Sequence, residues 1–213
     1  PPLTGGLAAM SWQQRLPKFI EVALALVVAF ALGRLTVHAS SEAKPGAVDI
    51  GFSQDMAVHH EQAILMANLA QTRGGAAVGS LANAILIDQS QEVGLMRGWL
   101  KLWNQPTGDP TPMAWMTDMP SMSMSGAAMP GMATPGQLTR LSTLTGHRFD
   151  VLFLQLMIRH HEGGLLMCRF AEDHAKLSVV RNAAKSMAFE QVADLGQMEA
   201  LLKSDGGRPL APD

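Results

Sequence analysis

The chain has 213 residues, of which 47% are hydrophobic and 16% charged, and its net charge is −2. This length and apolar content are enough for one well-packed core, and a composition rich in Ala, Leu and Met without any Tyr argues against a β fold. The chain contains no basic run, so we expect no nucleic-acid partner.

Near the N-terminus, residues 1–18 carry Arg15 and Lys18 and precede an apolar segment at 19–37. As a helix this segment extends about 28 Å, just enough to cross the hydrocarbon core of a membrane. The two cations predict a cytoplasmic N-terminus, a single-pass membrane anchor and a domain on the extracytoplasmic (periplasmic or extracellular) side. The small residues around Ala39 leave open the alternative that 19–37 is a signal peptide, cleaved there to release a secreted protein.

A short linker at 38–48 leads to a domain that we expect over 49–205, followed by a tail at 206–213. The apolar pattern predicts an all-α fold, an up-and-down four-helix bundle made of two hairpins. The long helices are expected at about 50–72, 77–103, 148–174 and 179–203, and a short one at about 134–144. Asp49 and Ser178 are predicted helix N-caps, and Thr134-Pro135-Gly136-Gln137 has the form of a capping box.

The first and third long helices carry the same motif, M-x-x-H-H-E-x-x-x-x-M, at an offset of 101 residues (157 minus 56). At 100° per residue, its two Met and two His side chains fall within about 120° of one helix face. The Glu of each copy, Glu61 or Glu162, points well away from the centre of that face. The eight residues on the two faces are Met56, His59, His60, Met66, Met157, His160, His161 and Met167.

The similarity continues on both sides of the motif, which indicates an internal duplication of a helical hairpin. Upstream, Asp49, Phe52 and Gln54 correspond to Asp150, Phe153 and Gln155; downstream, Gln89, Glu92, Met96 and Leu100 correspond to Gln191, Asp194, Met198 and Leu202. Gln89, Glu92, Gln191 and Asp194 are candidates for orienting the imidazoles through hydrogen bonds. A solvated polar stripe is an equally good interpretation of those four residues.

Imidazole together with thioether is a ligand set for copper, and for Cu(I) rather than Cu(II), because thioether sulfur binds soft metals. The alternative is that the Met side chains fill the core and the His side chains are hydrogen-bonded interior residues. Because two copies place paired histidines on an apolar face, metal binding is the better hypothesis. Four further residues are candidate additional ligands: Met96, Met198, Cys168 and His174.

Residues 104–133 are rich in Pro, Gly, Ser and Thr and lack apolar periodicity, so we expect a long surface excursion that adds nothing to the core. Seven of the 15 methionines lie in it. Exposed thioethers at this spacing favour a copper-capture loop, although the segment could instead cover an apolar patch or face a membrane or partner. These methionines are Met113, Met116, Met119, Met122, Met124, Met129 and Met132.

The doubled motif, with the matching residues from about 49 to 203, resembles the bacterial family known as domain of unknown function 305 (DUF305). This resemblance implies a ferritin-like helical bundle and copper handling outside the cytoplasm. It implies no reaction. A membrane-anchored, non-catalytic protein for copper sequestration, storage or transfer is therefore the leading hypothesis.

Other classes of function have less support in the sequence. A di-iron oxidase needs Glu-x-x-His pairs on bundle helices, and neither 89–93 nor 191–195 supplies the histidine. A zinc hydrolase would carry H-E-x-x-H, which adjacent histidines do not form. The remaining alternative is an accessory or structural subunit that docks on a larger membrane protein complex through its Met-rich excursion.

Overall fold

The computed structural model describes residues 22–23, 25–29, 44–116 and 129–210, and the chain forms two compact units, Pro1–Ala43 and Lys44–Asp213. Most of the predicted membrane span at 19–37 and the alternative cleavage site at Ala39 lie outside the described residues. Among the helices that are described, none has both the length and the apolar character needed to cross a membrane.

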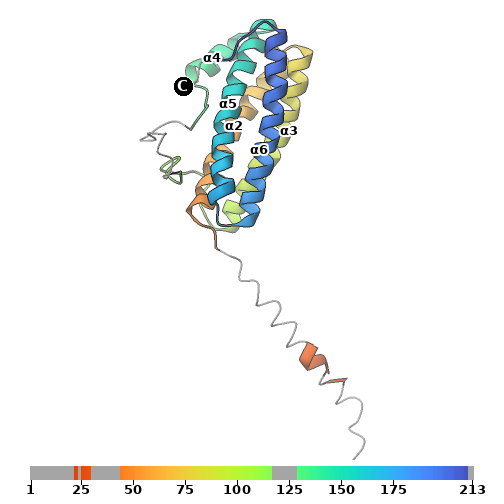
Figure 1. Ribbon diagram of the computed structural model, residues 1–213, viewed down its shortest axis with the longest axis vertical. Coiled ribbons are helices and arrows are strands. Elements are labelled where there is room, and N and C mark those ends of the chain that lie inside the picture. The colour runs from red at the N-terminus through yellow and green to blue at the C-terminus, as the bar shows by residue number, and fades with distance from the viewer. Residues whose placement is uncertain (1–21, 24, 30–43, 117–128, 211–213) are drawn as a thin grey trace, which may run out of the picture. The chain divides into compact units, whose positions relative to one another are not determined.

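The second unit is an up-and-down bundle of four long helices (Figure 1). α2 packs along α3 and α5 along α6, and the two hairpins meet mainly through α2 and α5. All four predicted helices are present, with ends within three residues of the expected positions. The helices are α2 at Ala47–Arg73, α3 at Ala76–Leu102, the short α4 at Pro135–Thr143, α5 at His147–His174 and α6 at Ser178–Ser204.

The starts of the helices confirm one predicted cap and correct two. Thr134 and Gln137 form the expected capping box of α4, with each side chain bonded to the other residue's backbone N–H. The prediction of Ser178 as a cap is wrong by one position, because Leu177 is the N-cap residue of α6. Asp49 is not an N-cap either, since α2 begins three residues earlier, after Gly46.

Asp49 instead joins the two hairpins. Its carboxylate accepts a hydrogen bond from Gly46 N at 2.6 Å, from Lys176 N at 3.2 Å and from Leu177 N at 2.9 Å. The last two amides belong to the turn between α5 and α6. A local pattern cannot show this contact, because its partners lie more than 120 residues away in the chain.

Asp150, the duplicate of Asp49, makes the reciprocal contact. It accepts hydrogen bonds from Gly75 N at 3.0 and 3.2 Å, in the turn between α2 and α3. Each hairpin therefore supplies the carboxylate that caps the turn of the other. A turn amide buried without such a partner would cost about 1–3 kcal/mol.

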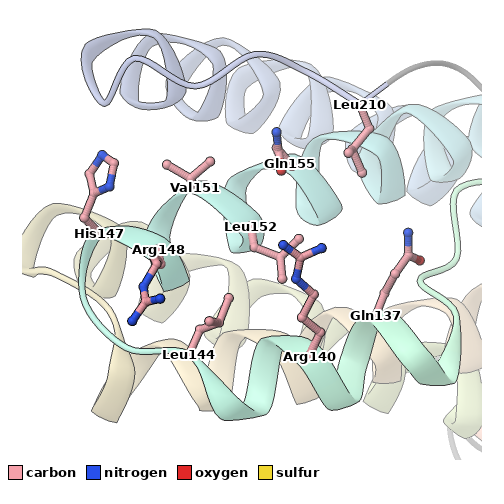
Figure 2. Close-up of a pocket in the computed structure, with 9 residues that line it drawn as sticks. All are labelled: Gln137, Arg140, Leu144, His147, Arg148, Val151, Leu152, Gln155 and Leu210. Carbon is pink, nitrogen blue, oxygen red and sulfur yellow. The ribbon is translucent and has the colours of Figure 1, made fainter.

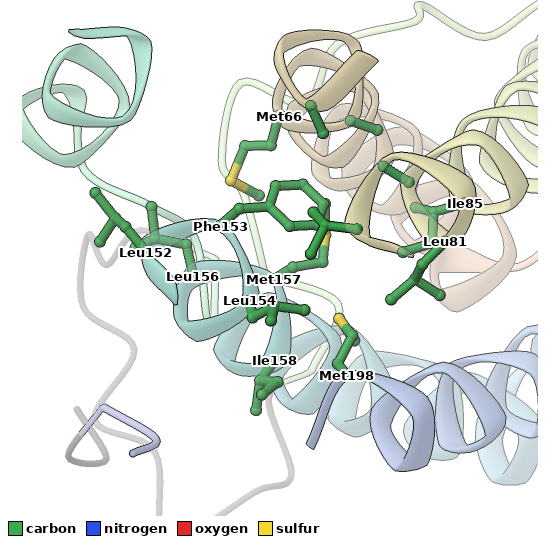
Figure 3. Close-up of a cluster of buried hydrophobic side chains, with 14 of the residues drawn as sticks. Met66, Leu81, Ile85, Leu152, Phe153, Leu154, Leu156, Met157, Ile158 and Met198 are labelled. Atoms are coloured by element: carbon green, nitrogen blue, oxygen red, sulfur yellow. The ribbon is translucent and has the colours of Figure 1, made fainter. Parts of the chain in front are cut away.

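The core consists of two clusters of buried side chains. The first lies near the α2–α3 turn and includes Phe149, Phe153, Leu154 and Leu156 from α5 with Ile85 from α3 (Figure 3). The second lies toward the opposite end of α2, around Phe52, Met167 and Phe170.

The start of the Met-rich excursion is part of this second cluster, so the prediction that it adds nothing to the core is wrong there. Met113, Trp115 and Met116 are buried. The buried carboxylate of Asp55 accepts hydrogen bonds from Met113 N at 2.6 Å and from Trp115 Nε1 at 2.8 Å, and the indole makes an edge contact with Phe52. Three anchoring residues within four positions leave no periodicity for a sequence pattern to reveal.

The other methionines of the excursion divide into two groups. Met129 and Met132 are half-buried, whereas Met119, Met122 and Met124 lie outside the described residues. A set of exposed capture thioethers over the whole of 104–133 is thus contradicted at Met113 and Met116.

Because Trp115 packs against one helical glycine and not another, we expect substitution of the two glycines to change stability in opposite directions. In Gly51→Ala the added methyl overlaps the indole of Trp115, which should cost about 1–3 kcal/mol of stability as overpacking. Gly94 on α3 has open space at the same place, so Gly94→Ala should gain up to about 1 kcal/mol from helix propensity. Urea unfolding of the two variants checks this. Equal effects of the two substitutions would contradict the buried position of Trp115.

Candidate metal centre

The four motif histidines meet in the middle of the bundle, where α2 and α5 cross. His60, His160 and His161 are fully buried, and His59 is 1% exposed. The rings of His59 and His160 lie face to face with centroids 3.8 Å apart and planes inclined by 32°. The two helices thus bring together side chains that are 101 residues apart in the chain.

The rings of the central pair are held by backbone carbonyls. His59 Nε2 donates to Pro130 O at 3.0 Å, and His160 Nε2 donates to His59 O at 3.0 Å. A carbonyl oxygen only accepts, so Nε2 must carry the proton in both rings. The neutral tautomer therefore leaves the lone pair on Nδ1.

The outer pair faces carboxylates on the second helix of each hairpin. His60 Nε2 lies 2.8 Å from Glu92 Oε2 on α3, and His161 Nε2 donates to Asp194 Oδ2 on α6 at 3.3 Å. Such a contact fixes the orientation and tautomer of an imidazole that binds metal through its other nitrogen. An orienting role for Glu92 and Asp194 fits this geometry and stays a prediction.

The two predicted glutamines are also beside the histidines. Gln89 and Gln191 are both buried, and Gln191 Nε2 contacts Cys168 Sγ at 3.8 Å. The close approach here depends on Gly164, because a Cβ at that position would lie 2.6 Å from Gln191 Oε1 and 3.1 Å from His59 Cε1. Gly164, which replaces Ala63 of the first repeat, thus permits close packing here.

The Nδ1 atoms of all four histidines have no hydrogen-bond partner within the described part of the chain. Leaving a buried acceptor unpaired costs about 1–3 kcal/mol each, and a native core rarely contains four of them together. A bare imidazole nitrogen is also a good ligand for copper. The unpaired atoms therefore fit a metal ion better than they fit a purely structural core.

Burial keeps these imidazoles neutral. Desolvation, with a further contribution from the neighbouring rings, lowers the pKa of His59 and of His60 from 6.5 to about 3. The same causes hold the pKa of His160 well below its usual value. At neutral pH no proton has to leave these three rings before a metal binds.

Acidic side chains lie on the outer side of the centre. Desolvation is the largest cause that raises the pKa of both Glu92 and Glu190 to about 7, and Asp88 raises both further. Glu92 also raises the pKa of Glu190, whereas the hydrogen bond with Glu190 lowers that of Glu92. Both glutamates line a cavity of about 470 Å³ between α3 and α6.

Six buried methionines of the two repeats divide between the core clusters, three in each. Met56, Met96 and Met167 belong to the cluster around Phe52. Met113, Met116 and Met187 also belong to that cluster. Met66 from α2, Met157 from α5 and Met198 from α6 belong to the other, where the ring of Phe153 lies between Met66 and Met157 (Figure 3). The duplication relates the two groups residue by residue, because Met56, Met96 and Met167 correspond to Met157, Met198 and Met66. We call these groups the first and the second methionine trio.

No three His, Cys, Asp or Glu side chains within residues 44–116 and 129–210 converge in a way that could hold a metal ion. The structure thus places four nitrogen donors in one region without a preformed site of nitrogen and oxygen ligands alone.

Cys168 and His174, both candidate additional ligands, have different positions. Cys168 is buried in the cluster of the first trio, where burial raises the pKa of its thiol well above the usual value. His174 is exposed at the end of α5, and its ring stacks on Phe170. Thirteen residues of helix, about 20 Å, separate it from His161. The structure therefore does not bring His174 to the centre.

A further cavity of about 410 Å³ lies between α4, α5 and the C-terminal segment, and sequence reasoning missed it (Figure 2). Arg140, Arg148 and His147 give it a basic lining over an apolar floor that includes Leu152. None of the predicted metal ligands lines this cavity.

A DUF305 protein of Streptomyces coelicolor, described as a candidate secreted protein, has the same fold: TM-score 0.70, 34% identity, 77% of this chain and 96% of that chain covered. A DUF305 fragment from Deinococcus radiodurans has a TM-score of 0.65 and 30% sequence identity, with 76% of this chain and 99% of that chain covered. CopM in the Cu(I)-bound form has a TM-score of 0.57 and 23% sequence identity, with 73% of this chain and 96% of that chain covered. No curated protein matches the chain.

The fold and the centre define a duplicated helical bundle with a buried histidine and methionine core. The model of the family described as "Domain of unknown function (DUF305)" matches residues 49–202, which is most of the chain. The protein belongs to the DUF305 family, as the doubled motif suggested.

The buried imidazoles predict how the stability of the apo protein depends on pH. The unfolded chain protonates His59 near pH 6.5, whereas the folded chain does so only near pH 3, so His59 destabilises the fold as the pH falls between these values. Glu92 and Glu190 act in the opposite sense between about pH 4.5 and 7, because folding raises their pKa. Between about pH 3 and 4.5, these two glutamates no longer oppose the effect of His59.

Between these pH values, His59→Asn should reduce the slope of the free energy of unfolding against pH by about 1.4 kcal/mol per pH unit, the value for one proton. The free energy of unfolding is measured by urea titration at several pH values. His147→Asn, at an exposed position, is the matched control and should follow the parent. A parent and His59→Asn with parallel curves would show that His59 is not held neutral.

Proposed function

We propose that this protein binds copper in the core of its bundle and acts outside the cytoplasm as a non-catalytic protein of copper sequestration, storage or transfer. The observation that carries the proposal is the set of four buried imidazoles whose Nδ1 atoms lack partners, flanked by two methionine trios. A core selected for packing alone would not retain four such atoms.

The donor types favour Cu(I). Thioether sulfur binds Cu(I) well and binds Mg²⁺, Ca²⁺ or Mn²⁺ poorly, and a site closed to water suits an ion that does not need carboxylate ligands. His60 follows Met56 by one helical turn, and His161 follows Met157 in the same way. We therefore assign one Cu(I) to each trio, with His60 and His161 as the nearest imidazole donors.

The relatives support the same chemistry. CopM, which shares the fold at 23% identity, is described in Cu(I)-bound and Cu(II)-bound forms. Because the fold alone carries over at that identity, copper in this chain is proposed on its own residues.

The proposed location of the protein outside the cytoplasm depends on the N-terminal segment. We propose that residues 19–37 anchor the chain in the membrane with the bundle on the extracytoplasmic side, in keeping with the candidate secreted relative. Cleavage near Ala39 is the alternative. The mass of the protein recovered from cell membranes decides between them, since an intact segment supports the anchor and a mature chain beginning near Ser40 in the soluble fraction contradicts it.

Removing sulfur from one trio at a time should remove one copper ion at a time. We expect Met56→Leu with Met96→Leu to lose one of two tightly bound Cu(I) ions, and Met157→Leu with Met198→Leu to lose the other. Leu for Met nearly conserves volume, so each change should cost less than about 1.5 kcal/mol of stability. Competitive titration with a Cu(I)-specific chelator under reducing conditions gives affinity and stoichiometry.

Ile85→Leu with Ile158→Leu is the matched control, because both side chains are buried, nearly keep their volume and carry no metal donor. It should bind as the parent does. Bound Cu(I) should also raise the melting temperature of the parent, and by less in the two double variants. The copper assignment fails if the parent, reduced and free of metal, neither binds Cu(I) nor gains thermal stability from it.

A further inference from the structure

The helices α3 and α6 lie side by side with few contacts between them, and we call the boundary between them the α3–α6 seam. The hairpins are joined through α2 and α5, and α3 touches α6 at few places. The cavity of about 470 Å³ lies on this seam and is lined by Asp88, Gln91, Glu92, Leu95, Ala183, Ser186, Met187 and Glu190. Three carboxyl groups and no basic side chain line it, so its field attracts cations.

One side chain separates this cavity from the histidine centre. Glu92 lines the cavity, its side chain is 15% exposed, and its Oε2 lies 2.8 Å from Nε2 of His60. The His60 side chain is fully buried and reaches toward the cavity wall, while its Nδ1 has no partner among the described residues. Glu92 is therefore in contact with both the cavity and the imidazole of His60.

The other sides of the centre are less suitable for a cation. At the face covered by residues 129–133, Pro130 O accepts the hydrogen bond from His59, and a Cβ at Gly163 would overlap the Pro130 backbone. The 410 Å³ cavity has a basic lining, which repels cations. A third cavity, of about 500 Å³, lies farther along the α3–α6 seam and has no charged side chain in its lining.

We propose that the acidic α3–α6 cavity is the route by which the metal ion enters and leaves the centre, with Asp88 and Glu190 as the capturing groups and Glu92 as the gate. This inference rests on the proposed function. Carboxylate oxygen holds Cu(I) weakly compared with thioether and imidazole, so an ion attracted to the cavity is not trapped there and passes on to the softer donors.

The test measures how fast the intact, reduced apo protein takes up Cu(I) from a weak chelator in a stopped-flow instrument. At pH 8, above the pKa of about 7 of Glu190, Asp88→Asn with Glu190→Gln removes two cavity charges and leaves the proposed ligands untouched. Asp173→Asn with Glu199→Gln, two exposed acidic residues that line none of the cavities described above, is the control of equal charge. Ser186→Trp obstructs the cavity without changing its charge.

At an ionic strength near 0.01 M, the cavity variant should load about three- to tenfold more slowly than the control, and the difference should disappear near 1 M, where charges are screened. Ser186→Trp should slow loading at both ionic strengths. All variants should bind the same final number of Cu(I) ions as the parent.

Equal loading rates for the cavity variant and its control at low salt would overturn the entry route while leaving copper binding intact. A lower final stoichiometry in the cavity variant would also overturn it, because the carboxylates would then be ligands of the stored ion. A parent that binds no Cu(I) at equilibrium would overturn both the route and the proposed function.

Discussion

The burial of four imidazoles in the core governs the design of this bundle. Each ring needs an acceptor for its Nε2 proton, and the bundle supplies carbonyls to the central pair and carboxylates to the outer pair. These contacts determine where α3, α6 and the segment at 129–133 must lie relative to α2 and α5. The cost of desolvation is thus offset on one side of each ring, and the other side remains available to a ligand.

The two repeats make matching contacts around the centre, but the partners of His59 and His160, where the repeats meet, differ. His60 with Glu92 and His161 with Asp194 are matching pairs, as are the two methionine trios. Where the repeats meet, His160 Nε2 donates to the backbone carbonyl of His59, whereas His59 Nε2 donates to the backbone carbonyl of Pro130 in the excursion. Cys168 has no counterpart in the first repeat either, so the two halves of the centre differ chemically even though their helices are equivalent.

Much of the fold was predictable, because helix positions and the hairpin repeat depend on local periodicity and on residue correspondence. The same correspondence identified the methionines of both trios and placed Glu92 and Asp194 near the histidines. It could not give the stacking of His59 on His160, which depends on how closely two helices approach. Asp49 and Trp115 were misjudged for a related reason, since the partners that bury them are distant in the chain and leave no local pattern.

The exchange of aspartates between the hairpins has the form of a contact between two symmetric copies. A single hairpin would leave Asp49 without the turn that it caps, and two copies related by a two-fold axis would satisfy both turns at once. The bundle thus resembles a two-fold dimer whose halves lie in one chain. In a symmetric dimer every substitution appears twice, whereas this chain has Ala63 in one half and Gly164 in the other, and Cys168 in one half alone. The two halves of the centre can therefore differ, which two identical subunits do not allow.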